Sequence, residues 1–166
     1  MSSGTSNYCI IVPCYEAHAK MLNNTLESMA SHGIDIVVVD DGSSSEYAKI
    51  IAKVCMDFNA IHLVNPTNTG KGGAFKLGLN YIYEKGYDYA LQVDADGQHD
   101  TEVLNKLIDK SKENPGALIS GRPIYDDTIP TGRLVGRYIT HIWVWIETLS
   151  FTIIDSMCGF RCYPVA

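Results

Sequence analysis

The sequence predicts an α/β protein in which helices cover both faces of a mainly parallel β-sheet. Short apolar runs, several rich in β-branched residues, alternate with stretches whose apolar residues recur at helical spacing. The connections between them are short, and each apolar run is followed by polar or glycine-rich residues. This alternation favours a three-layer α/β/α sandwich, in which ligands bind beyond the carboxyl ends of the strands.

The individual elements follow from the same patterns. We expect strands where apolar runs of four to six residues occur, at 8–12, 34–39, 61–64, 89–93 and 117–120. We expect helices where apolar residues line one side of a helical projection, at 22–31, 46–58, 73–84 and 102–112. Residues 158–164 form either the last strand or the start of a further strand in a longer protein, and we favour the longer protein.

Composition and charge exclude several classes of protein. The 166 residues suit one domain, and 46% of them are hydrophobic, which is ordinary for a globular chain. A net charge of −6 leaves no basic stripe for nucleic acid. Five cysteines without a CxxC pair argue against a disulfide framework or a thiolate zinc site and favour reduced thiols. Lacking a signal peptide or a long apolar span, the chain is expected in the cytoplasm.

The basic residues are divided along the chain by type. All nine lysines precede position 122, and the four arginines are Arg122, Arg133, Arg137 and Arg161. Arginine suits bidentate capture of phosphate, so the last quarter of the chain is predicted to bind a phosphate group; a chance partition is the alternative.

Two carboxylates follow the fourth expected strand. Asp94 and Asp96 are alternate residues leaving that strand, so they can point the same way, with Gly97 permitting a sharp turn behind them. Close carboxylates repel unless a cation lies beside them, and oxygen ligands select Mg²⁺ or Mn²⁺. Gln98 could add a neutral oxygen. The alternative is an Asp-rich turn that caps the next helix.

Two further strand ends carry polar chemistry. Asp40 and Asp41 close the second strand, where a carboxylate could accept a base N–H or ribose hydroxyls or simply form a turn. Lys71 lies within a glycine-rich helix start, which favours anions, unless the lysine is merely solvated. This is no Walker A loop, because Gly72 stands where Ser or Thr is required, and no GxGxxG follows the first strand.

Taken together and in order, these motifs resemble family 2 glycosyltransferases of the GT-A fold. They read VPCYEA, VVVDDGSSS, NTGKGGA, VDADGQH, SGR and DSMCGFR, and they cover roughly residues 8–164. Among these enzymes the chain is most similar to the dolichyl- or polyprenyl-phosphate sugar synthases. The resemblance implies a GT-A, Rossmann-like three-layer sandwich, with a flexible N-terminus over 1–7 and one catalytic domain over 8–166 that continues beyond Ala166 in the natural protein.

The resemblance also implies a site for a nucleoside diphosphate sugar. Pro13, Tyr15 and Glu16 would line the base and ribose, although the family usually reads Pro-x-Tyr-Asn-Glu where this chain reads Pro-Cys-Tyr-Glu-Ala. In the rest of the donor site, Asp40 and Asp41 would hold the nucleoside, and Lys71 would lie near the nucleotide. Mg²⁺ or Mn²⁺ would be bound by Asp94, Asp96 and Gln98.

The activity implied is inverting sugar transfer, with two acceptors left open. A lipid phosphate would be held by Arg122 and either Arg133 or Arg137, and it needs no strong base. A saccharide or protein hydroxyl would need a carboxylate base, for which Asp155 is the candidate unless it is a buried partner of Arg161. A binding module without turnover is a third reading. Residues 138–154, with Trp143 and Trp145, either rest peripherally on a membrane or pack in the core.

Overall fold

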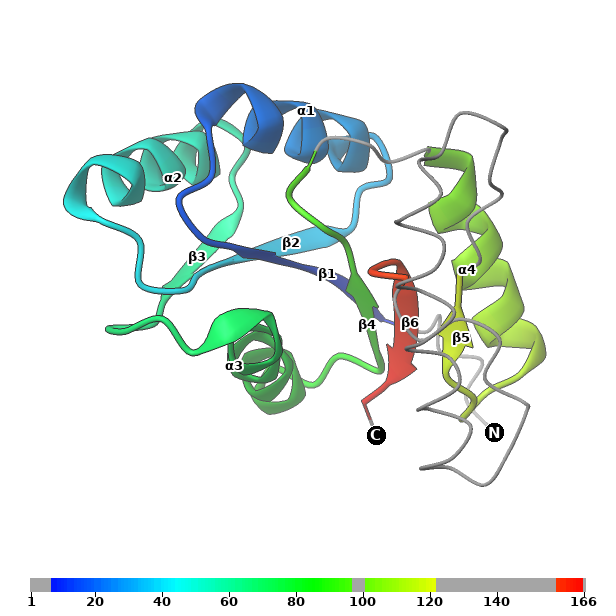
Figure 1. The fold of residues 1–166 in the computed structure, drawn as a ribbon. Helices are drawn as coiled ribbons and strands as arrows, with labels where there is room; N and C mark the ends of the chain where they lie inside the picture. Colours follow the sequence, from blue (N-terminus) through cyan, green and yellow to red (C-terminus); the bar gives the residue numbers. More distant parts are fainter. Residues whose placement is uncertain (1–6, 97–100, 122–157, 166) are drawn as a thin grey trace, which may run out of the picture.

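The computed structural model describes residues 7–96, 101–121 and 158–165, with only the backbone described at 101 and 102 (Figure 1). Strands and helices alternate as the sequence predicts, and the α/β fold is confirmed. Their order is β1 (Tyr8–Cys14), α1 (Ala19–Ala30), β2 (Asp35–Asp40), α2 (Ser45–Asp57), β3 (Ile61–Val64), α3 (Gly70–Glu84), β4 (Tyr89–Gln92), α4 (Thr101–Glu113), β5 (Ile119–Ser120) and β6 (Arg161–Pro164).

The six described strands form one sheet in the order β3-β2-β1-β4-β6-β5. The first four run parallel, so their carboxyl ends lie along one edge of the sheet. Strand β6 is antiparallel to both neighbours and separates β4 from β5. The segment 158–164 near the end of the chain therefore supplies an internal strand of this sheet, which lies beside β4.

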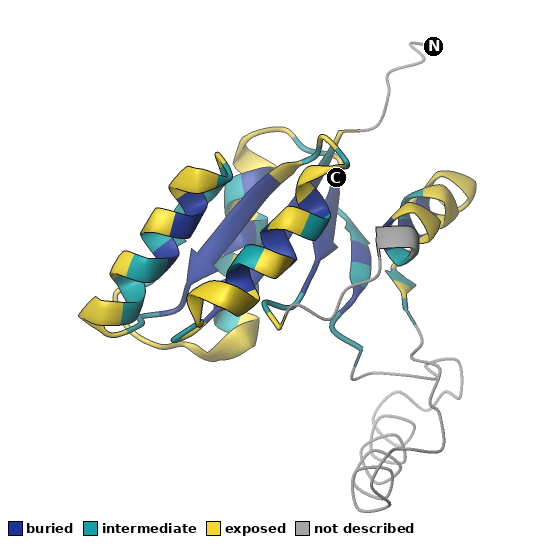
Figure 2. Ribbon diagram, turned by 90° about the horizontal axis from the view of Figure 1, so that it is seen from above, coloured by how far each residue is buried: buried dark blue, intermediate teal, exposed yellow. Residues whose placement is uncertain are grey.

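Helices cover both faces of the sheet, as expected. One face carries α1, α2 and α4, whose buried residues Leu22, Ile51 and Leu104 join a single apolar cluster with Ile10 and Val12 of β1. The opposite face carries α3, whose core-facing residues pack on the alternate residues of β1 and β2. Figure 2 shows the central strands β1, β2 and β4 buried and each helix exposed on its outer side. The layers hold the loops at the carboxyl edge in fixed places.

Helix α3 begins at Gly70, three residues earlier than the predicted 73–84, because Thr69, the residue before it, is held by hydrogen bonds to the Asp41 carboxylate. Gly78 lets the helix lie close to β1, since a Cβ there would be 2.6 Å from Ile11 Cγ2. The first turn of α3 thus contains Lys71 and reaches the carboxyl edge. Strand β5 is shorter than the predicted 117–120, because Gly116 turns the chain in the left-handed region at φ +86°.

Candidate nucleotide and cation site

Backbone hydrogen bonds continue past the ends of the parallel strands and tie their loops together. Asp41 N donates to Cys14 O (2.9 Å), and Asn65 N donates to Asp40 O (2.8 Å). Val93 N donates to Ile11 O (3.0 Å) on the other side of β1. The loops after β1, β2, β3 and β4 are therefore neighbours, as the sequence predicts for a parallel sheet.

Asp41 clamps the loop after β3 to the end of β2. Its carboxylate accepts hydrogen bonds from Thr69 N (3.1 and 3.0 Å), Thr69 Oγ1 (2.7 Å) and Asn65 Nδ2 (2.7 Å), and the residue is 2% exposed. Burial acts to raise the pKa of Asp41, but the hydrogen bonds from Asn65 and Thr69 outweigh it and lower the pKa. An ionised Asp41 thus fixes where α3 begins.

Asp40 differs from Asp41 in having one carboxylate oxygen that accepts no hydrogen bond from the described residues. The residue is fully buried, and its Oδ1 accepts a hydrogen bond from Ser43 N (3.0 Å). Its Oδ2 is buried and has no hydrogen-bond partner among the residues that the structure describes. Ser43 Oγ in turn accepts from Glu16 N (2.8 Å), which joins this turn to the loop after β1.

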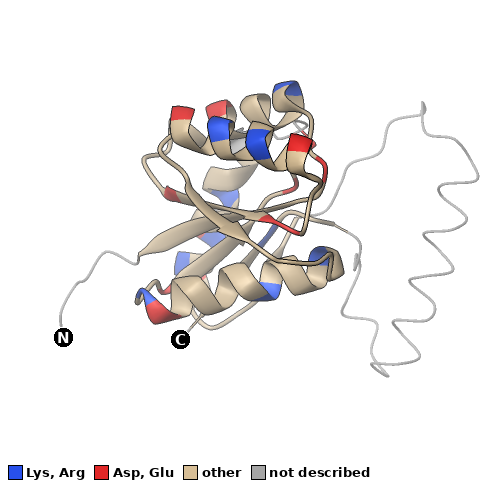
Figure 3. Ribbon diagram, turned by 90° about the vertical axis from the view of Figure 1, so that its left-hand side faces the viewer, with Lys and Arg blue, Asp and Glu red and all other residues tan. Residues whose placement is uncertain are grey.

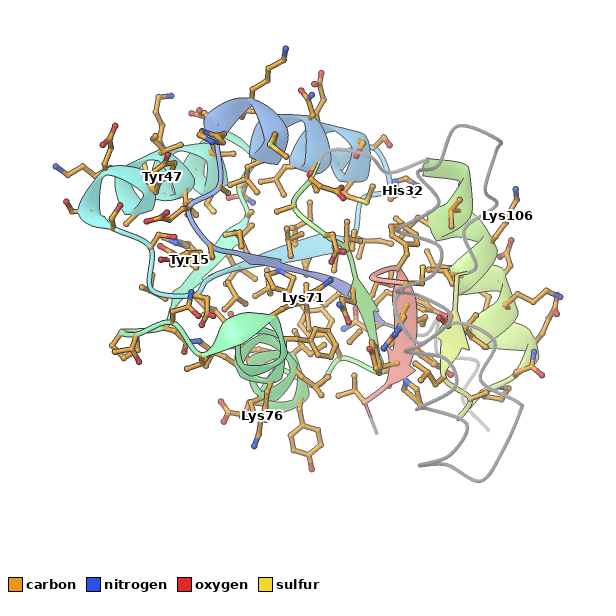
Figure 4. All side chains as sticks on the ribbon, in the orientation of Figure 1. Tyr15, His32, Tyr47, Lys71, Lys76 and Lys106 are labelled. Atoms are coloured by element: carbon orange, nitrogen blue, oxygen red, sulfur yellow. The ribbon has the colours of Figure 1, made fainter. Side chains whose placement is uncertain are left out.

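Three of the residues expected at the nucleotide lie in β1 or in the loop that follows it. Pro13 is a buried residue of β1 itself, paired with Val39. Tyr15 is 52% exposed beside the loop after β2, and Glu16 adopts φ +47°, an uncommon conformation for a residue with a side chain (Figure 4). Tyr15 and Glu16 therefore lie where a ligand can reach them.

An ion pair joins the start of α3 to the end of β4. Lys71 Nζ lies 2.5 Å from Asp94 Oδ1, and the two side chains are 52% and 30% exposed. Figure 4 shows Lys71 on the sheet side of α3 and Lys76 pointing away on the outer side. Asp96 is exposed in the turn that follows. Five of the predicted site residues fall outside the described part: Gln98, Arg122, Arg133, Arg137 and Asp155.

The carboxylates after β4 suit a hard divalent cation. Across the described ranges, no three His, Cys, Asp or Glu residues gather into a metal cluster. Asp94 and Asp96 offer two carboxylates, and Mg²⁺ typically takes one or two and keeps its other positions for water and phosphate. Asp94 already receives a cation, the ammonium of Lys71. The donor set therefore fits Mg²⁺ or Mn²⁺.

Several residues of this region were missed by sequence reasoning. Asn65 directly follows β3 and Thr69 directly precedes α3, and these positions were the available signal. Gly159 approaches Asp94 from the segment before β6. On β6, Arg161 Nη1 donates to Tyr163 Oη (3.4 Å), and Tyr163 Oη donates to Gln92 Oε1 (3.0 Å). These contacts needed the antiparallel placement of β6, which the sequence did not indicate.

Charge is unevenly distributed over the described residues. Figure 3 shows the charged residues mainly on the helices and loops, while the strands are almost wholly uncharged. A fully buried aspartate at the end of β2 therefore departs from the pattern of the sheet. Buried carboxylates are costly without compensation, and Asp40 Oδ2 has no hydrogen-bond partner among the described residues, so the end of β2 is a candidate binding edge.

Comparison with known proteins identifies the family. The model of the family "Glycosyl transferase family 2" matches residues 9–165. The chain belongs to glycosyltransferase family 2. This family member is 33% identical to the UDP-N-acetylglucosamine–dolichyl-phosphate N-acetylglucosaminyltransferase of Methanococcus voltae, covering 93% of this chain and 68% of the relative. It is 26% identical to the polyprenol monophosphomannose synthase of Mycolicibacterium smegmatis, covering 96% and 62% respectively.

Solved structures confirm the fold of this glycosyltransferase family member. Glucosyl-3-phosphoglycerate synthase from Mycobacterium tuberculosis superimposes with a TM-score of 0.70 at 15% identity, over 96% of this chain and 57% of that one. The same synthase in complex with Mn²⁺ and uridine-diphosphate-glucose gives a TM-score of 0.70 at 14% identity, over 96% of this chain and 56% of that one. The chain spans 52% to 69% of the length of the curated relatives it matches. The predicted GT-A type of fold and the predicted dolichyl- or polyprenyl-phosphate branch are both confirmed.

Proposed function

We propose that this family 2 glycosyltransferase moves a sugar, with inversion, from a nucleoside diphosphate sugar to a polyprenyl or dolichyl phosphate. The observation that carries the proposal is that the buried carboxylate of Asp40 and the Lys71–Asp94 ion pair lie at the same edge of the sheet. Asp40 gives a hydrogen-bond acceptor for a nucleoside. Lys71 supplies a positive charge for the diphosphate, and Asp94 supplies a negative charge for the cation. Relatives named for dolichyl-phosphate and polyprenol acceptors support the choice of acceptor.

In the donor site, each residue has a distinct role. Asp40 Oδ2 accepts an N–H or hydroxyl of the nucleoside, because a buried oxygen without a partner among the described residues gains most from a donor. Tyr15 and Glu16 border the nucleoside, and Lys71 pairs with a phosphate oxygen. Asp41 acts indirectly by holding Thr69 and the start of α3.

We assign Mg²⁺ or Mn²⁺ to Asp94 and Asp96, with Gln98 as a third ligand. When bound, the ion neutralises the diphosphate and makes it a better leaving group. Asp94 and Asp96 supply the negative charge that keeps the ion beside the diphosphate. Lys71 adds positive charge from the start of α3, where the backbone N–H groups also favour an anion.

The reaction is a single displacement at the anomeric carbon. An oxygen of the acceptor phosphate forms the new bond to that carbon while the bond to the diphosphate breaks, and the diphosphate leaves with the electron pair. The phosphate oxygen is already anionic near neutral pH, so no general base is required. Arg122 with Arg133 or Arg137 would hold the acceptor phosphate.

We further propose that residues 138–154 rest on a membrane surface, where a lipid phosphate acceptor is found. Trp143 and Trp145 suit the boundary between membrane and water. None of the helices in the described ranges has the length and apolar character needed to cross a bilayer. The form of membrane association that we propose is peripheral contact from the cytoplasmic side.

A thermal-shift screen with UDP, GDP and their common sugar conjugates, with and without Mn²⁺, tests the donor site. The correct nucleotide should raise Tm in the presence of Mn²⁺, because a ligand that binds only the folded state stabilises it. Asp94→Ala and Asp96→Ala should abolish the shift, whereas Asp57→Ala, at an exposed acid of α2, should keep it. A folded protein that responds to no nucleotide would contradict the proposal.

A transfer assay distinguishes the acceptors. With a polyprenyl phosphate as acceptor, Arg122→Ala and Arg133→Ala should lose activity and Asp155→Ala should retain it. Activity only on a hydroxyl acceptor, lost in Asp155→Ala, would favour saccharide or protein glycosylation. Nucleotide binding with neither transfer nor hydrolysis would identify a binding module.

A further inference from the structure

Gly159 lies directly against the carboxylate of Asp94. Strand β6 pairs Arg161 with Gln92, so the same antiparallel register carried two residues further places Gly159 opposite Asp94. A Cβ added at Gly159 would lie 2.5 Å from Asp94 Cγ and 2.6 Å from Asp94 Oδ1, and closer still to Oδ2. Real Cβ atoms do not approach other atoms so closely, so no larger residue fits without displacing the carboxylate.

Backbone conformation does not explain a glycine at this position. Gly159 is not among the residues with a positive φ, so the left-handed backbone conformation that favours glycine is not the reason for it here. This distinguishes it from Gly42, Gly70 and Gly116, which adopt φ between +76° and +86°. The requirement for glycine at 159 therefore comes from the contact with Asp94.

The segment that carries Gly159 is fixed and cannot withdraw from Asp94. The next residue, Phe160, is 7% exposed and belongs to the apolar cluster beneath α1, α2 and α4. Its carbonyl oxygen accepts a hydrogen bond from Gly121 N (2.9 Å), which ties the segment to the end of β5. A side chain at 159 would consequently move Asp94 rather than the segment.

We propose that Gly159 is a positioning residue for the cation site. Because Gly159 has no side chain, the Asp94 carboxylate can lie directly against its backbone. In this position, Asp94 Oδ1 forms the ion pair with the ammonium of Lys71. A methyl group at 159 would turn the carboxylate away from this direction. The inference rests on the proposed function for its metal, and it adds a residue that touches neither metal nor nucleotide.

Mn²⁺ binding measured by electron paramagnetic resonance, with the matching nucleoside diphosphate present, tests the proposal. Gly159→Ala should weaken Mn²⁺ binding by about tenfold or more, the usual effect of disturbing residues behind a metal ligand. Gly121→Ala is the matched control, because its Cβ would meet Phe160 O (3.2 Å) and Cys158 Sγ (3.3 Å) and not Asp94. Unchanged Mn²⁺ affinity in a folded Gly159→Ala variant would overturn the proposal.

A double-mutant cycle covers the case in which Gly159→Ala folds poorly. Asp94→Ala removes the carboxylate that the added methyl group would strike, so Gly159→Ala should lower Tm in the wild-type background and have little effect in the Asp94→Ala background. An equal loss of Tm in both backgrounds would refute the role of Gly159. Wild-type protein that binds no Mn²⁺ even with nucleotide would instead contradict the proposed function, and the cycle would remain interpretable.

Discussion

Asp40 and Asp41 are adjacent in sequence but have different environments. Asp41 is satisfied by four hydrogen bonds from the loop after β3 and the start of α3, whereas Asp40 retains a buried oxygen that no described residue contacts. The sequence marked both as candidates for the nucleoside. The contacts distinguish the two: Asp41 holds the scaffold, and the buried oxygen of Asp40 is the one that we propose for the nucleoside.

Replacing Asp41 by Asn should destabilise the fold by about 1–3 kcal/mol, because charge-assisted hydrogen bonds from Thr69 and Asn65 are lost or left facing an amide. Urea unfolding at neutral pH measures this change. Asp57→Asn, which alters an exposed ion pair on α2, should shift the free energy of unfolding by less than about 1 kcal/mol. Equal losses of unfolding free energy in Asp41→Asn and Asp57→Asn would contradict the role of Asp41 in holding the loop after β3.

The lowered pKa of Asp41 gives the clamp a defined pH dependence. A carboxyl whose pKa is lower in the folded state stabilises the protein fully above its ordinary value of 3.8, and this stabilisation disappears as pH falls through the folded value. The difference in unfolding free energy between wild type and Asp41→Asn should therefore be constant near neutral pH and narrow in acid. Unfolding curves of both proteins, collected from pH 6 down to the lowest pH at which they are folded, test whether the difference in unfolding free energy decreases in acid.

Replacing Lys71 by Met should have opposite effects on metal and nucleotide. Without nucleotide, Mn²⁺ binding should tighten by about two- to fivefold, since a partly exposed ion pair that competes for Asp94 is worth about 1 kcal/mol or less. Nucleotide binding should weaken, because a cation near the diphosphate is lost. Lys76→Met, on the outer side of the same helix, controls for net charge and should change neither affinity. Calorimetric titrations with Mn²⁺ and with nucleotide measure both affinities. Weaker Mn²⁺ binding in Lys71→Met would contradict the competition of Lys71 with the metal for Asp94.

At the scale of elements, helix α3 depends on close approach to the sheet. Gly78→Ala would place a methyl group 2.6 Å from Ile11 Cγ2 and 3.2 Å from Val39 Cγ2, so we expect a loss of about 1–3 kcal/mol in spite of alanine's better helix propensity. Gly72→Ala, in open space on the same helix, should be neutral or stabilising. Chemical denaturation of both variants tests this contrast, which fails if Gly78→Ala is as stable as wild type.

The elements differ in how far the sequence predicts them. Val37, Val38 and Val39 mark a buried strand because continuous β-branched runs suit a sheet covered on both faces. Strand β6 could be recognised as a strand, but not placed, because its pairing with β4 joins residues about 70 positions apart and runs against the parallel pattern. The parallel pattern allowed Asp40, Lys71 and Asp94 to be predicted at one edge of the sheet, whereas Gly159 was missed because it lies beside the antiparallel β6.

At the scale of the whole molecule, the thiols are protected by the core. All five cysteines are described, none forms a disulfide, and all except Cys158 are buried. Burial raises the pKa of Cys9 to about 12 and those of Cys55 and Cys162 to about 11, and it also raises the pKa of Cys14. These four thiols remain protonated at neutral pH.

Thiol labelling with an aromatic disulfide reagent should therefore distinguish Cys158 from the rest. We expect one thiol to react quickly in the native protein and the other four only on unfolding, because the reactive thiolate is scarce and shielded in the core. Absorbance of the released thiolate counts the reacted groups. Cys158→Ser should remove the fast phase, and rapid labelling of two or more thiols would contradict the described packing.

The position of β6 also determines when this edge of the molecule can form. Among the described strands β5 pairs only with β6, and β6 follows it by about 40 residues. The pairings of β1 with β2 and of β2 with β3 join nearer segments, which close with a smaller loss of chain entropy. During synthesis the β1–β3 half can thus assemble while Asp94 still lacks its neighbour Gly159. A nascent chain would acquire the contact between Gly159 and the Asp94 carboxylate only after residues 158–164 have left the ribosome.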